Sequence, residues 1–341
     1  MSDPLRIGII GMGFIGQTHA RAFRDAAADG YPCRLRAVCD PDPERLTGLD
    51  TASGNITSGS TAAQLFDPDT IATYNHADQL LADDQVDLVC VCTHTDSHVD
   101  LAIRALNANK HVLVEKPVAT TCTAIERLIE RADRSDRLVI PAMCVRSWPG
   151  WSHLKQCIED DRYGRVVHAR FERLGGPPQW ASDFYADANR SGGAIFDLHV
   201  HDADFAMHLF GPPQSVFSTG SRAHIQTLAI YPDGPKVSIE GGWLNDPSFP
   251  FRMTYTVEFE RAVVTFDSRR DHPMEIHTGG ETQRPDIGSS TGFDQQARAI
   301  CSALTRGQNQ QTLPTLRETL AVTKFIEAEL VSTESGRPEP L

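Results

Sequence analysis

Residues 6–16 read Arg-Ile-Gly-Ile-Ile-Gly-Met-Gly-Phe-Ile-Gly, and this stretch decides the fold of the first part of the chain. An apolar run leads into glycines spaced as GxGxxG and then into a helical pattern, which is the order found at dinucleotide-binding turns. Gly11 allows the tight turn, Gly13 lets the backbone approach a pyrophosphate, and Gly16 lets helix and strand pack closely. An ordinary strand-to-helix turn is the alternative. The residues that we expect to bind the dinucleotide are Gly11, Gly13, Phe14, Ile15 and Gly16.

A second apolar run, residues 35–39, ends in Asp40, which lies 24 residues beyond Gly16. This spacing is near the distance at which an acidic residue meets the adenosine ribose of NAD. A carboxylate at this position accepts hydrogen bonds from the ribose 2'-hydroxyl and repels the 2'-phosphate of NADP. We therefore expect NAD to be preferred over NADP, unless Arg45, the nearest basic residue after Asp40, turns toward the ribose and offsets the repulsion.

The length and composition limit the class of protein. The chain has 341 residues, which exceeds the length at which single cores usually stop growing, so we expect two domains. Its 45 acidic and 32 basic residues give a formal net charge of -13, which repels the phosphates of nucleic acids and anionic lipids. Most of the eight cysteines lie in apolar runs, and no signal peptide or membrane-spanning run is recognised. We expect a cytoplasmic enzyme with no nucleic-acid or membrane partner.

Strand-like and helix-like segments alternate in the first part of the chain. We expect helices over 78–83, 97–109 and 121–135 and strands over 87–92, 111–114 and 138–143. Residues 51–70 are rich in Ser, Thr, Gly and Asp, and we expect a surface loop there. The alternation predicts an α/β Rossmann domain with a doubly wound parallel sheet over residues 1–145, which binds ligands outside the carboxyl ends of its strands.

The pattern changes beyond about residue 150, where short strand-like runs predominate. They lie at 166–174, 215–219, 228–231, 237–243, 252–258 and 262–266, with helices over 197–209, 294–305 and 316–331. We therefore expect an α+β domain with a large, mostly antiparallel sheet over residues 146–341, whose C-terminal helices are able to pack back on the first domain. The predicted helices leave one sheet face uncovered. We expect that face to be apolar and to be buried in a homodimer or homotetramer.

Two polar segments follow parallel strands of the first domain, where a cofactor would lie. Glu115-Lys116-Pro117 follows the strand over 111–114, which places Lys116 near the nicotinamide half. A lysine at a strand end is more often a surface charge, so position alone leaves both roles open. Residues 93–98 follow the preceding strand, and capping of the next helix is their alternative role. We assign cofactor binding to Thr93, His94, His98, Glu115 and Lys116.

A second group of polar residues lies within the expected helix over 197–209. Asp197 and His201 are four residues apart, and such residues lie about 5–6 Å apart on one helix face. Both side chains can therefore point into one cleft. Histidine suits proton transfer, and a neighbouring carboxylate can orient its ring. The alternatives are a helix cap for Asp197 and a core role for His201.

The same stretch also invites a metal-binding interpretation. Its candidate ligands are His199, His201, Asp202, Asp204 and His208. On a helix, the side chains of His199 and Asp202 point away from the face that the other three share. Because the candidates do not converge, we expect no metal.

Taken together, these motifs resemble the Gfo/Idh/MocA family of NAD(P)-dependent oxidoreductases, named for glucose-fructose oxidoreductase, inositol dehydrogenase and a rhizopine catabolism protein. The resemblance covers nearly the whole chain. It is carried by Gly11-Met-Gly-Phe-Ile-Gly16, Glu115-Lys-Pro117, Gly192-Gly193, Asp197-x-x-x-His201 and the terminal helix region 314–328. The resemblance implies that Lys116, Asp197 and His201 line the substrate site and are catalytic.

The sequence departs from the family pattern in three places. Ala194 follows Gly192-Gly193 at a position where the family commonly has a third glycine. His199, two residues before His201, lies in a region where the family commonly has a glycine. The family often has Trp followed by Arg upstream of the glycines, whereas Ala181 follows Trp180 here. Arg190 is a candidate to substitute for that arginine.

The resemblance implies hydride transfer between nicotinamide and a secondary alcohol or ketone of a sugar, inositol or related polyol. In the oxidation direction His201 takes the hydroxyl proton, Asp197 orients His201 or holds a neighbouring hydroxyl, and Lys116 stabilises alkoxide charge. Our candidates for the substrate wall are Arg146, Trp148, Trp180, Asp183, Arg190 and His199. An NAD-dependent glycosidase that acts by transient oxidation and a non-catalytic NAD-binding regulator remain as alternatives.

Overall fold

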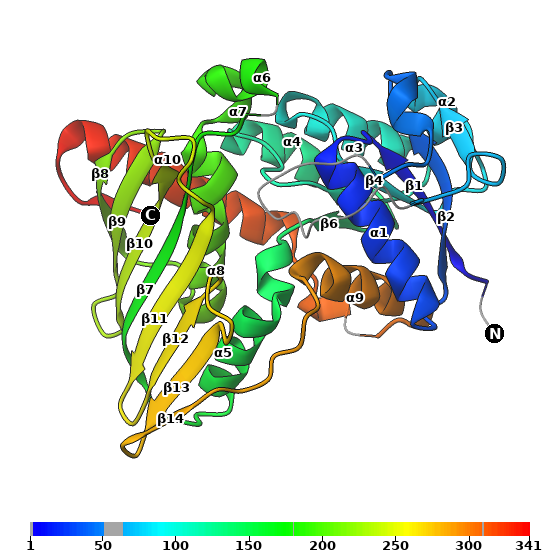
Figure 1. Cartoon of the computed structure of the whole chain (residues 1–341). Coiled ribbons are helices and arrows are strands. Elements are labelled where there is room, and N and C mark those ends of the chain that lie inside the picture. The colour runs from blue at the N-terminus through cyan, green and yellow to red at the C-terminus, as the bar shows by residue number, and fades with distance from the viewer. Residues whose placement is uncertain (1–2, 51–63, 180, 309) are drawn as a thin grey trace. The chain divides into compact units, whose positions relative to one another are not determined.

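The computed structural model describes residues 3–50, 64–179, 181–308 and 310–341, and Figure 1 shows its elements. Contacts divide the chain into two compact units. The first comprises residues 1–144 and 291–320, and the second comprises residues 145–290 and 321–341. Residues 291–320, which the sequence analysis places in the second domain, therefore belong to the first unit. Most of the loop expected over 51–70 lies outside the described residues, as does Trp180.

The first unit contains a six-stranded parallel sheet in the order β3-β2-β1-β4-β5-β6. Its strands are β1 (Leu5–Ile10), β2 (Cys33–Cys39), β3 (Ala72–Tyr74), β4 (Leu88–Val91), β5 (His111–Val114) and β6 (Val139–Pro141). Every neighbouring pair runs parallel. The strand order reverses between β1 and β4, which is the switch point where such sheets bind ligands. The prediction of a doubly wound parallel sheet is confirmed.

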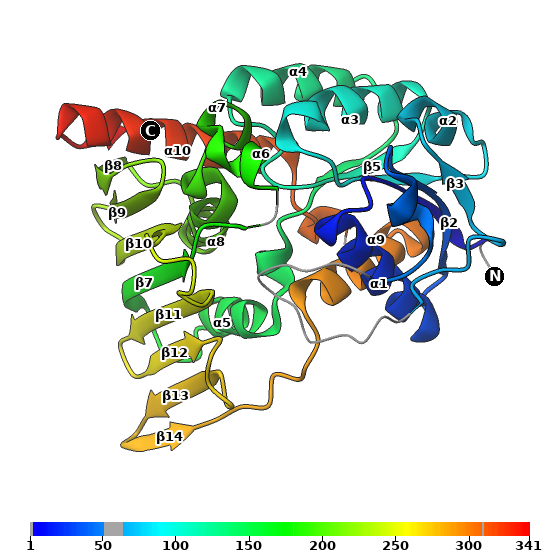
Figure 2. The same ribbon diagram turned by 45° about the horizontal axis from the view of Figure 1, so that its top comes forward.

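Helices cover both faces of this sheet because each carries an apolar stripe. They are α1 (Phe14–Ala28), α2 (Ala77–Ala82), α3 (His98–Asn107), α4 (Cys122–Ala132), α9 (Gly292–Arg306) and the first residues of α10 (Leu316–Ser335). Figure 2 shows α3 and α4 on one side of the sheet and α1 and α9 on the other. Leu101, Ile125 and Leu128 pack against strand residues such as Val89 and Val91, and Leu316 joins the same core cluster.

The second unit contains a nine-stranded sheet in the order β14-β13-β12-β11-β7-β10-β9-β8-β15. Its strands are β7 (Val166–Gly175), β8 (Ser215–Gly220), β9 (His224–Ile230), β10 (Lys236–Trp243), β11 (Arg252–Phe259), β12 (Val263–Asp267), β13 (Met274–Thr278), β14 (Glu281–Gln283) and β15 (Glu339–Pro340). β7 and β10 pair in parallel and the other neighbours are antiparallel. The prediction of a mostly antiparallel sheet is confirmed, although the sequence analysis missed the short strands β13, β14 and β15.

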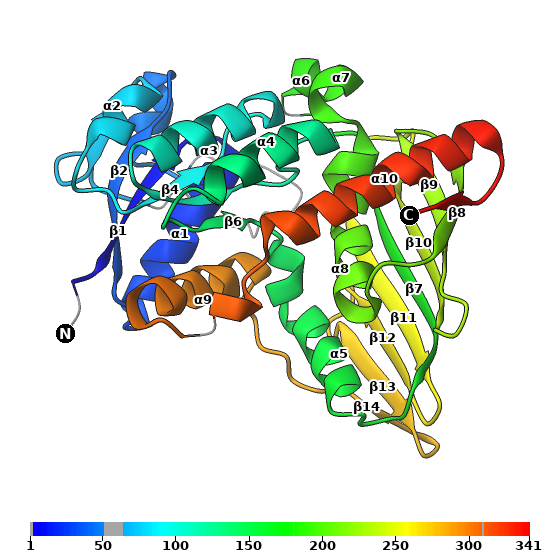
Figure 3. The same cartoon turned by 180° about the vertical axis from the view of Figure 1, so that it is seen from behind.

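One face of this sheet carries α5 (Pro149–Glu159), α8 (Val200–Phe210) and the rest of α10, as Figure 3 shows. Trp151 of α5 is fully buried, with its ring centroid 4.4 Å from that of Phe266 and 5.3 Å from that of Tyr255. A Cβ atom at Gly150 would lie 2.6 Å from the Phe266 ring, so glycine allows this close packing. The sequence analysis missed α5 because Pro149-Gly150 is typical of a turn, whereas proline also begins helices.

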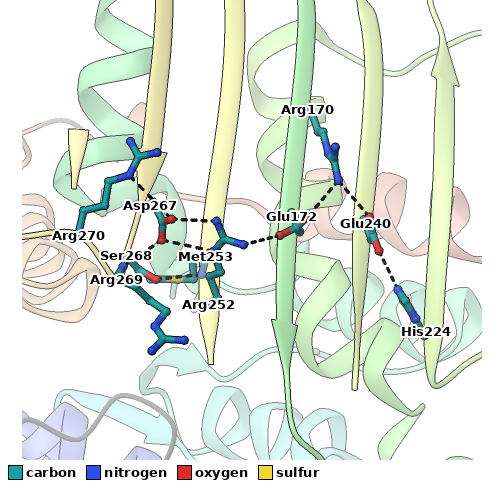
Figure 4. Close-up of polar contacts among 10 residues, drawn as sticks. All are labelled: Arg170, Glu172, His224, Glu240, Arg252, Met253, Asp267, Ser268, Arg269 and Arg270. Carbon is teal, nitrogen blue, oxygen red and sulfur yellow. Dashed lines mark hydrogen bonds and ion pairs between the residues drawn. The ribbon is translucent and has the colours of Figure 1, made fainter. Parts of the chain in front are cut away.

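The opposite face of the nine-stranded sheet is polar, and Figure 4 shows its ion pairs. Arg170 Nη2 lies 2.9 Å from Glu172 Oε2 and 3.4 Å from Glu240 Oε2. Arg252 links Glu172 to Asp267, at 3.6 Å and 2.9 Å respectively. The expectation of an apolar open face is therefore wrong. Side chains alternate between the faces of a strand, so Ala169 and Phe171 of β7 lie on the helix-covered face and Arg170 and Glu172 on the other.

Candidate functional site

The glycine turn between β1 and α1 has the geometry of a phosphate cradle. Gly11 has φ +92°, and a Cβ atom there would lie 2.5 Å from Cys92 O. A Cβ atom at Gly16 would lie 1.8 Å from Gly11 O, so close packing requires both glycines. At Gly13, by contrast, a Cβ atom would have one neighbour within 4 Å among the described residues, Arg45 Nη1 at 3.6 Å. The backbone of Gly13 is therefore open to an approaching pyrophosphate.

The first turn of α1 supports the same interpretation. Its N-cap is Gly13, which has no side chain to cap the helix, and the first turn contains no acidic residue. The first amide groups of a helix lack acceptors within the helix, and together with the helix dipole they attract anions. Phe14, Ile15 and Gly16 begin the helix, so their amides are the groups that would face the phosphates. Gly13 and the first turn of α1 therefore have the properties needed to bind the phosphates of a dinucleotide.

Asp40 follows the end of β2 and holds the glycine turn in place. Its Oδ2 accepts a hydrogen bond from Met12 N at 2.7 Å, and its Oδ1 accepts one from Asp42 N at 3.0 Å. Arg45 Nη1 lies 3.6 Å from Asp40 Oδ2, and the Arg45 side chain is 49% exposed. The residue that we assigned to the ribose therefore also positions the turn, and an exposed guanidinium stands beside both Asp40 and Gly13.

Glu115, at the end of β5, is an interior residue that connects α1 to Lys116. Its Oε1 lies 2.6 Å from Nε2 of His19 on α1, and both side chains are buried. Its Oε2 accepts a hydrogen bond from Lys116 N at 3.0 Å. The carboxylate thus ties the backbone of Lys116 to the helix that would bind the phosphates. The sequence analysis assigned Glu115 to the cofactor and did not identify His19.

His98, at the start of α3, is a buried residue that connects two of the segments assigned to cofactor binding. Its Nδ1 lies 2.9 Å from Pro117 O and its Nε2 lies 3.0 Å from Thr93 O, so it joins the segments that follow β4 and β5. Burial lowers the pKa of His98. Thr93 Oγ1 hydrogen-bonds Ser97 Oγ at 2.6 Å, and Ser97 Oγ also donates to His94 O at 2.8 Å. The predicted cofactor segment 93–98 is therefore braced by its own polar groups.

In the second unit, Asp197 and His201 lie where a π-helical turn, Ile195–His199, continues into α8. The two glycines before this turn adopt left-handed conformations, Gly192 with φ +79° and Gly193 with φ +80°. A Cβ atom at Gly193 would lie 2.7 Å from Arg222 O, which explains the requirement for glycine. The expected α-helix over 197–209 therefore begins as a wider π-helical turn, a feature that is frequent at functional sites.

Three buried polar pairs hold the segment around His201. His199 Nε2 lies 2.7 Å from Glu329 Oε1 on α10. Asp202 accepts two hydrogen bonds from Arg173 of β7, at 2.7 Å and 3.1 Å. The side chains of these four residues are 0–2% exposed. The structure places His199, which we assigned to the substrate wall, in the interior, where its ring faces Glu329.

The other expected substrate residues lie in several elements. Arg146, in the 3-10 turn Cys144–Ser147, donates two hydrogen bonds to Asp204, at 2.8 Å and 2.6 Å, which is the third buried pair. Trp148 is the half-buried N-cap of α5. Asp183, in α6 (Ser182–Ala186), and Arg190, in α7 (Ala188–Ser191), are exposed, and the Arg190 guanidinium lies 5.3 Å from the centroid of the Phe184 ring.

Three buried partners were not identified from the sequence: His19, which contacts Glu115, Arg173, which contacts Asp202, and Glu329, which contacts His199. Each has the same signal, a polar side chain at a position that strand or helix periodicity assigns to the buried face. Arg173 alternates with buried Ala169 and Phe171 on β7, and Glu329 follows buried Phe325 and Ile326 on α10. A buried polar side chain needs a partner, so this signal could have marked them.

In the part of the chain that the structure describes, no group of three or more His, Cys, Asp and Glu side chains is arranged to hold a metal ion. No described helix combines the length and the apolar character that crossing a bilayer requires.

The chain matches two parts of one family. Residues 5–143 match the domain described as an oxidoreductase family with an NAD-binding Rossmann fold, and residues 151–275 match the Gfo/Idh/MocA C-terminal domain. The chain therefore belongs to the Gfo/Idh/MocA family of oxidoreductases. The resemblance inferred from the sequence motifs is confirmed.

Among curated relatives, myo-inositol 2-dehydrogenase of Thermotoga maritima is 29% identical over 222 residues, which is 64% of this chain and 58% of the relative. Inositol 2-dehydrogenase of Rhizobium meliloti strain 1021 is 26% identical over 296 residues, which is 83% of this chain and 82% of the relative. The chain thus spans less than two thirds of the length of several curated relatives that it matches.

Solved structures show the same fold at low sequence identity. Levoglucosan dehydrogenase in complex with NADH and L-sorbose superposes with a TM-score of 0.83 at 18% identity, with 99% of each chain covered. An oxidoreductase from Agrobacterium radiobacter in complex with NAD+, L-tartaric acid and magnesium superposes with a TM-score of 0.80, also at 18% identity, with 98% of each chain covered.

Proposed function

We propose that this protein is an NAD-dependent dehydrogenase or reductase that acts on a secondary alcohol or ketone of a sugar, inositol or related polyol. The observation that carries the proposal is the family match, which runs through both the glycine turn and the helix of Asp197 and His201. Relatives named inositol 2-dehydrogenase and neighbours crystallised with sugars support the substrate class. The open backbone at Gly13 supports the cofactor.

In this proposal the three motif residues divide the chemistry. When bound, the nicotinamide supplies the acceptor or donor of the hydride. In the oxidation direction His201 takes the proton from the substrate hydroxyl, and Asp197 orients His201 or holds a neighbouring hydroxyl. Lys116 stabilises the negative charge that develops on the substrate oxygen. Reduction reverses these roles, with His201 returning the proton.

We also propose that NAD is preferred over NADP. Asp40 supports this preference because its carboxylate adjoins the turn that would hold the pyrophosphate. Arg45 is the opposing group, since an exposed guanidinium beside Gly13 would attract a 2'-phosphate. We expect Asp40 to dominate because it is buried and held by two backbone amides, whereas Arg45 must give up solvent exposure to reach a ligand.

The proposed quaternary state is a homodimer or homotetramer in the cytoplasm. Because the open face of the nine-stranded sheet is charged, subunits that meet there would form a polar interface. Light scattering after size-exclusion chromatography would measure the mass of the assembly. None of the eight cysteines, all of which lie in the described ranges, forms a disulfide, and seven of them are buried, which is compatible with a reducing compartment.

A substrate screen tests the proposed function. The purified protein is incubated with NAD and a panel that contains myo-inositol and other inositols, aldoses, ketoses and anhydrosugars, and NADH formation is followed. We expect NADH formation with at least one polyol and a rate about 100-fold to 10,000-fold lower with the variant His201→Ala. Release of aglycone from a glycoside without net NADH would instead identify a glycosidase and contradict the proposal.

A further inference from the structure

The pair formed by His199 and Glu329 joins two segments that lie 130 residues apart in the sequence. His199 ends the π-helical turn, and Glu329 lies in α10. Both side chains are 0% exposed, so the 2.7 Å contact between Nε2 and Oε1 is made entirely inside the second unit. A Cβ atom at Gly241 of β10 would lie 2.6 Å from His199 Cβ, so glycine at this position lets the imidazole lie against the sheet.

This pair is poorly explained as a stabilising contact. Among the described residues, His199 Nδ1 and Glu329 Oε2 have no hydrogen-bond partner, so each side chain is only half satisfied. A buried polar atom without a partner loses its hydration with no compensating bond. Replacement of a buried charged pair by apolar residues of similar volume is often neutral or stabilising. The pair therefore calls for an explanation other than stability.

The location of the pair suggests that explanation. His199 lies two residues after Asp197 and two before His201, at the point where the π-helical turn becomes an α-helix. A π-helical turn contains one residue more than an α-helical turn, so its width sets the direction of the side chains on either side of it. Without a fixed point at this position, the turn could rewind to α-helix and rotate Asp197 relative to His201.

Two further pairs hold the helix after this point but not before it. Asp202 is fixed by Arg173, and Asp204 is fixed by Arg146. Both are C-terminal to His201, so they fix α8 and not the turn that precedes it. Among the three pairs, His199–Glu329 alone lies between Asp197 and His201.

We propose that His199 and Glu329 are positioning residues, whose hydrogen bond fixes the π-helical turn so that Asp197 and His201 present their side chains together. The inference rests on the proposed function, because it assigns the two presented residues to catalysis. Neither His199 nor Glu329 is expected to touch substrate or cofactor. Their effect reaches the reaction through the orientation of Asp197 and His201.

The test replaces the polar pair by an apolar pair of similar volume, His199→Leu with Glu329→Met. We expect the melting temperature to be unchanged or raised. We expect kcat for the substrate found in the screen to fall about 10-fold to 100-fold, the range that a small misplacement of reacting groups can cause. The dissociation constant of NADH should stay within about threefold, since the glycine turn belongs to the other unit. Loss of the fold, or wild-type kcat, would overturn the inference.

Two further variants separate positioning from a general effect of mutation. Glu329→Gln retains an acceptor for His199 Nε2, so we expect it to keep kcat within about threefold of wild type. A loss as large as that of the apolar pair would overturn the inference, because the hydrogen bond is retained. The matched control is Ser218→Ala with Thr227→Val, which removes a buried 2.8 Å hydrogen bond between β8 and β9 in the same unit. This control should leave kcat unchanged, and an equal loss would also overturn the inference.

Combining the pair replacement with His201→Ala distinguishes this inference from the proposed function. If His199 and Glu329 act by positioning Asp197 and His201, the pair replacement should lower the residual kcat of His201→Ala by less than about threefold. A full additional loss would show that the pair acts independently of His201 and would overturn the inference. If His201→Ala alone retained wild-type turnover, the proposed function would fail instead.

Discussion

His19 on α1 and Glu115 after β5 are joined by a 2.6 Å contact between Nε2 and Oε1, although 96 residues separate them in the sequence. Glu115 uses its other oxygen to accept a hydrogen bond from the backbone of Lys116. The helix that begins at the glycine turn is therefore connected to the proposed catalytic lysine through one buried carboxylate.

This connection predicts that His19→Leu lowers kcat by about 10-fold to 100-fold, because the Lys116 backbone loses a fixed point and small misplacements of reacting groups are costly. His19→Gln, which retains a donor, should recover most of the activity. The control is His111→Gln, since His111 lies at the opposite end of β5. Steady-state kinetics with the screened substrate measure all three. Equal losses in the Leu and Gln variants would contradict a role for the hydrogen bond.

His201→Ala should lower turnover by about 100-fold to 10,000-fold, the range expected for a lost general acid or base. NADH binding, followed by fluorescence titration, should be nearly unchanged because the glycine turn belongs to the other unit. Lys116→Ala should weaken both cofactor binding and turnover, whereas Asp197→Asn, which removes a negative charge four residues before His201, should mainly alter the pH profile of turnover. Wild-type turnover of His201→Ala across the neutral pH range would show that the imidazole is only structural.

Asp40→Asn should reduce the preference for NAD over NADP by at least about 10-fold. The amide oxygen can still accept a hydrogen bond from Met12 N, so the glycine turn is kept, while the negative charge that repels a 2'-phosphate is lost. The ratio of kcat/KM for the two cofactors is the measurement. Asp42→Asn is the control, because Asp42 is half exposed and lies two residues further along. An equal or higher kcat/KM of the wild-type protein with NADP would sink the claim.

Stability should decrease as the pH falls below about 6.5, the ordinary pKa of histidine. Burial lowers the pKa of His98, His111 and His153 in the folded protein, so the unfolded chain takes up protons first. Their contribution to the free energy of unfolding is therefore complete above the unfolded pKa and is lost as the pH falls toward the folded values. Melting temperatures measured from about pH 8 to about pH 5 test this, and His98→Gln should flatten the decline.

Activity should survive prolonged chelation, and the purified protein should contain no stoichiometric zinc. Three of the five residues that invite a metal-binding interpretation are already engaged, His199 with Glu329, Asp202 with Arg173 and Asp204 with Arg146. They face different elements, so they cannot share one ion with His201. Elemental analysis and assays after treatment with a chelator provide the measurements. Loss of turnover that one metal ion per chain restores would revive the metal site.

The sequence by itself determined the fold class of the first unit, because the motifs that specify a Rossmann fold lie within short stretches of the chain. The glycines at 11 and 16 are required by a turn of six residues, and the alternation of apolar strands and amphipathic helices is visible in short windows. The strand predicted over 111–114 and the helix predicted over 97–109 reflect this, since the structure places β5 at His111–Val114 and α3 at His98–Asn107. Asp197 and His201 were found as candidates because one motif contains both.

Only the tertiary structure decided what each buried polar residue contacts. His199 looks like a substrate residue in the sequence, and it becomes a buried partner once Glu329 is brought to it from 130 positions away. The open sheet face is charged because period-two alternation assigns Arg170, Glu172 and Glu240 to the side without helices. Such pairings depend on strand order and helix packing between distant segments, and a local sequence pattern contains no record of them.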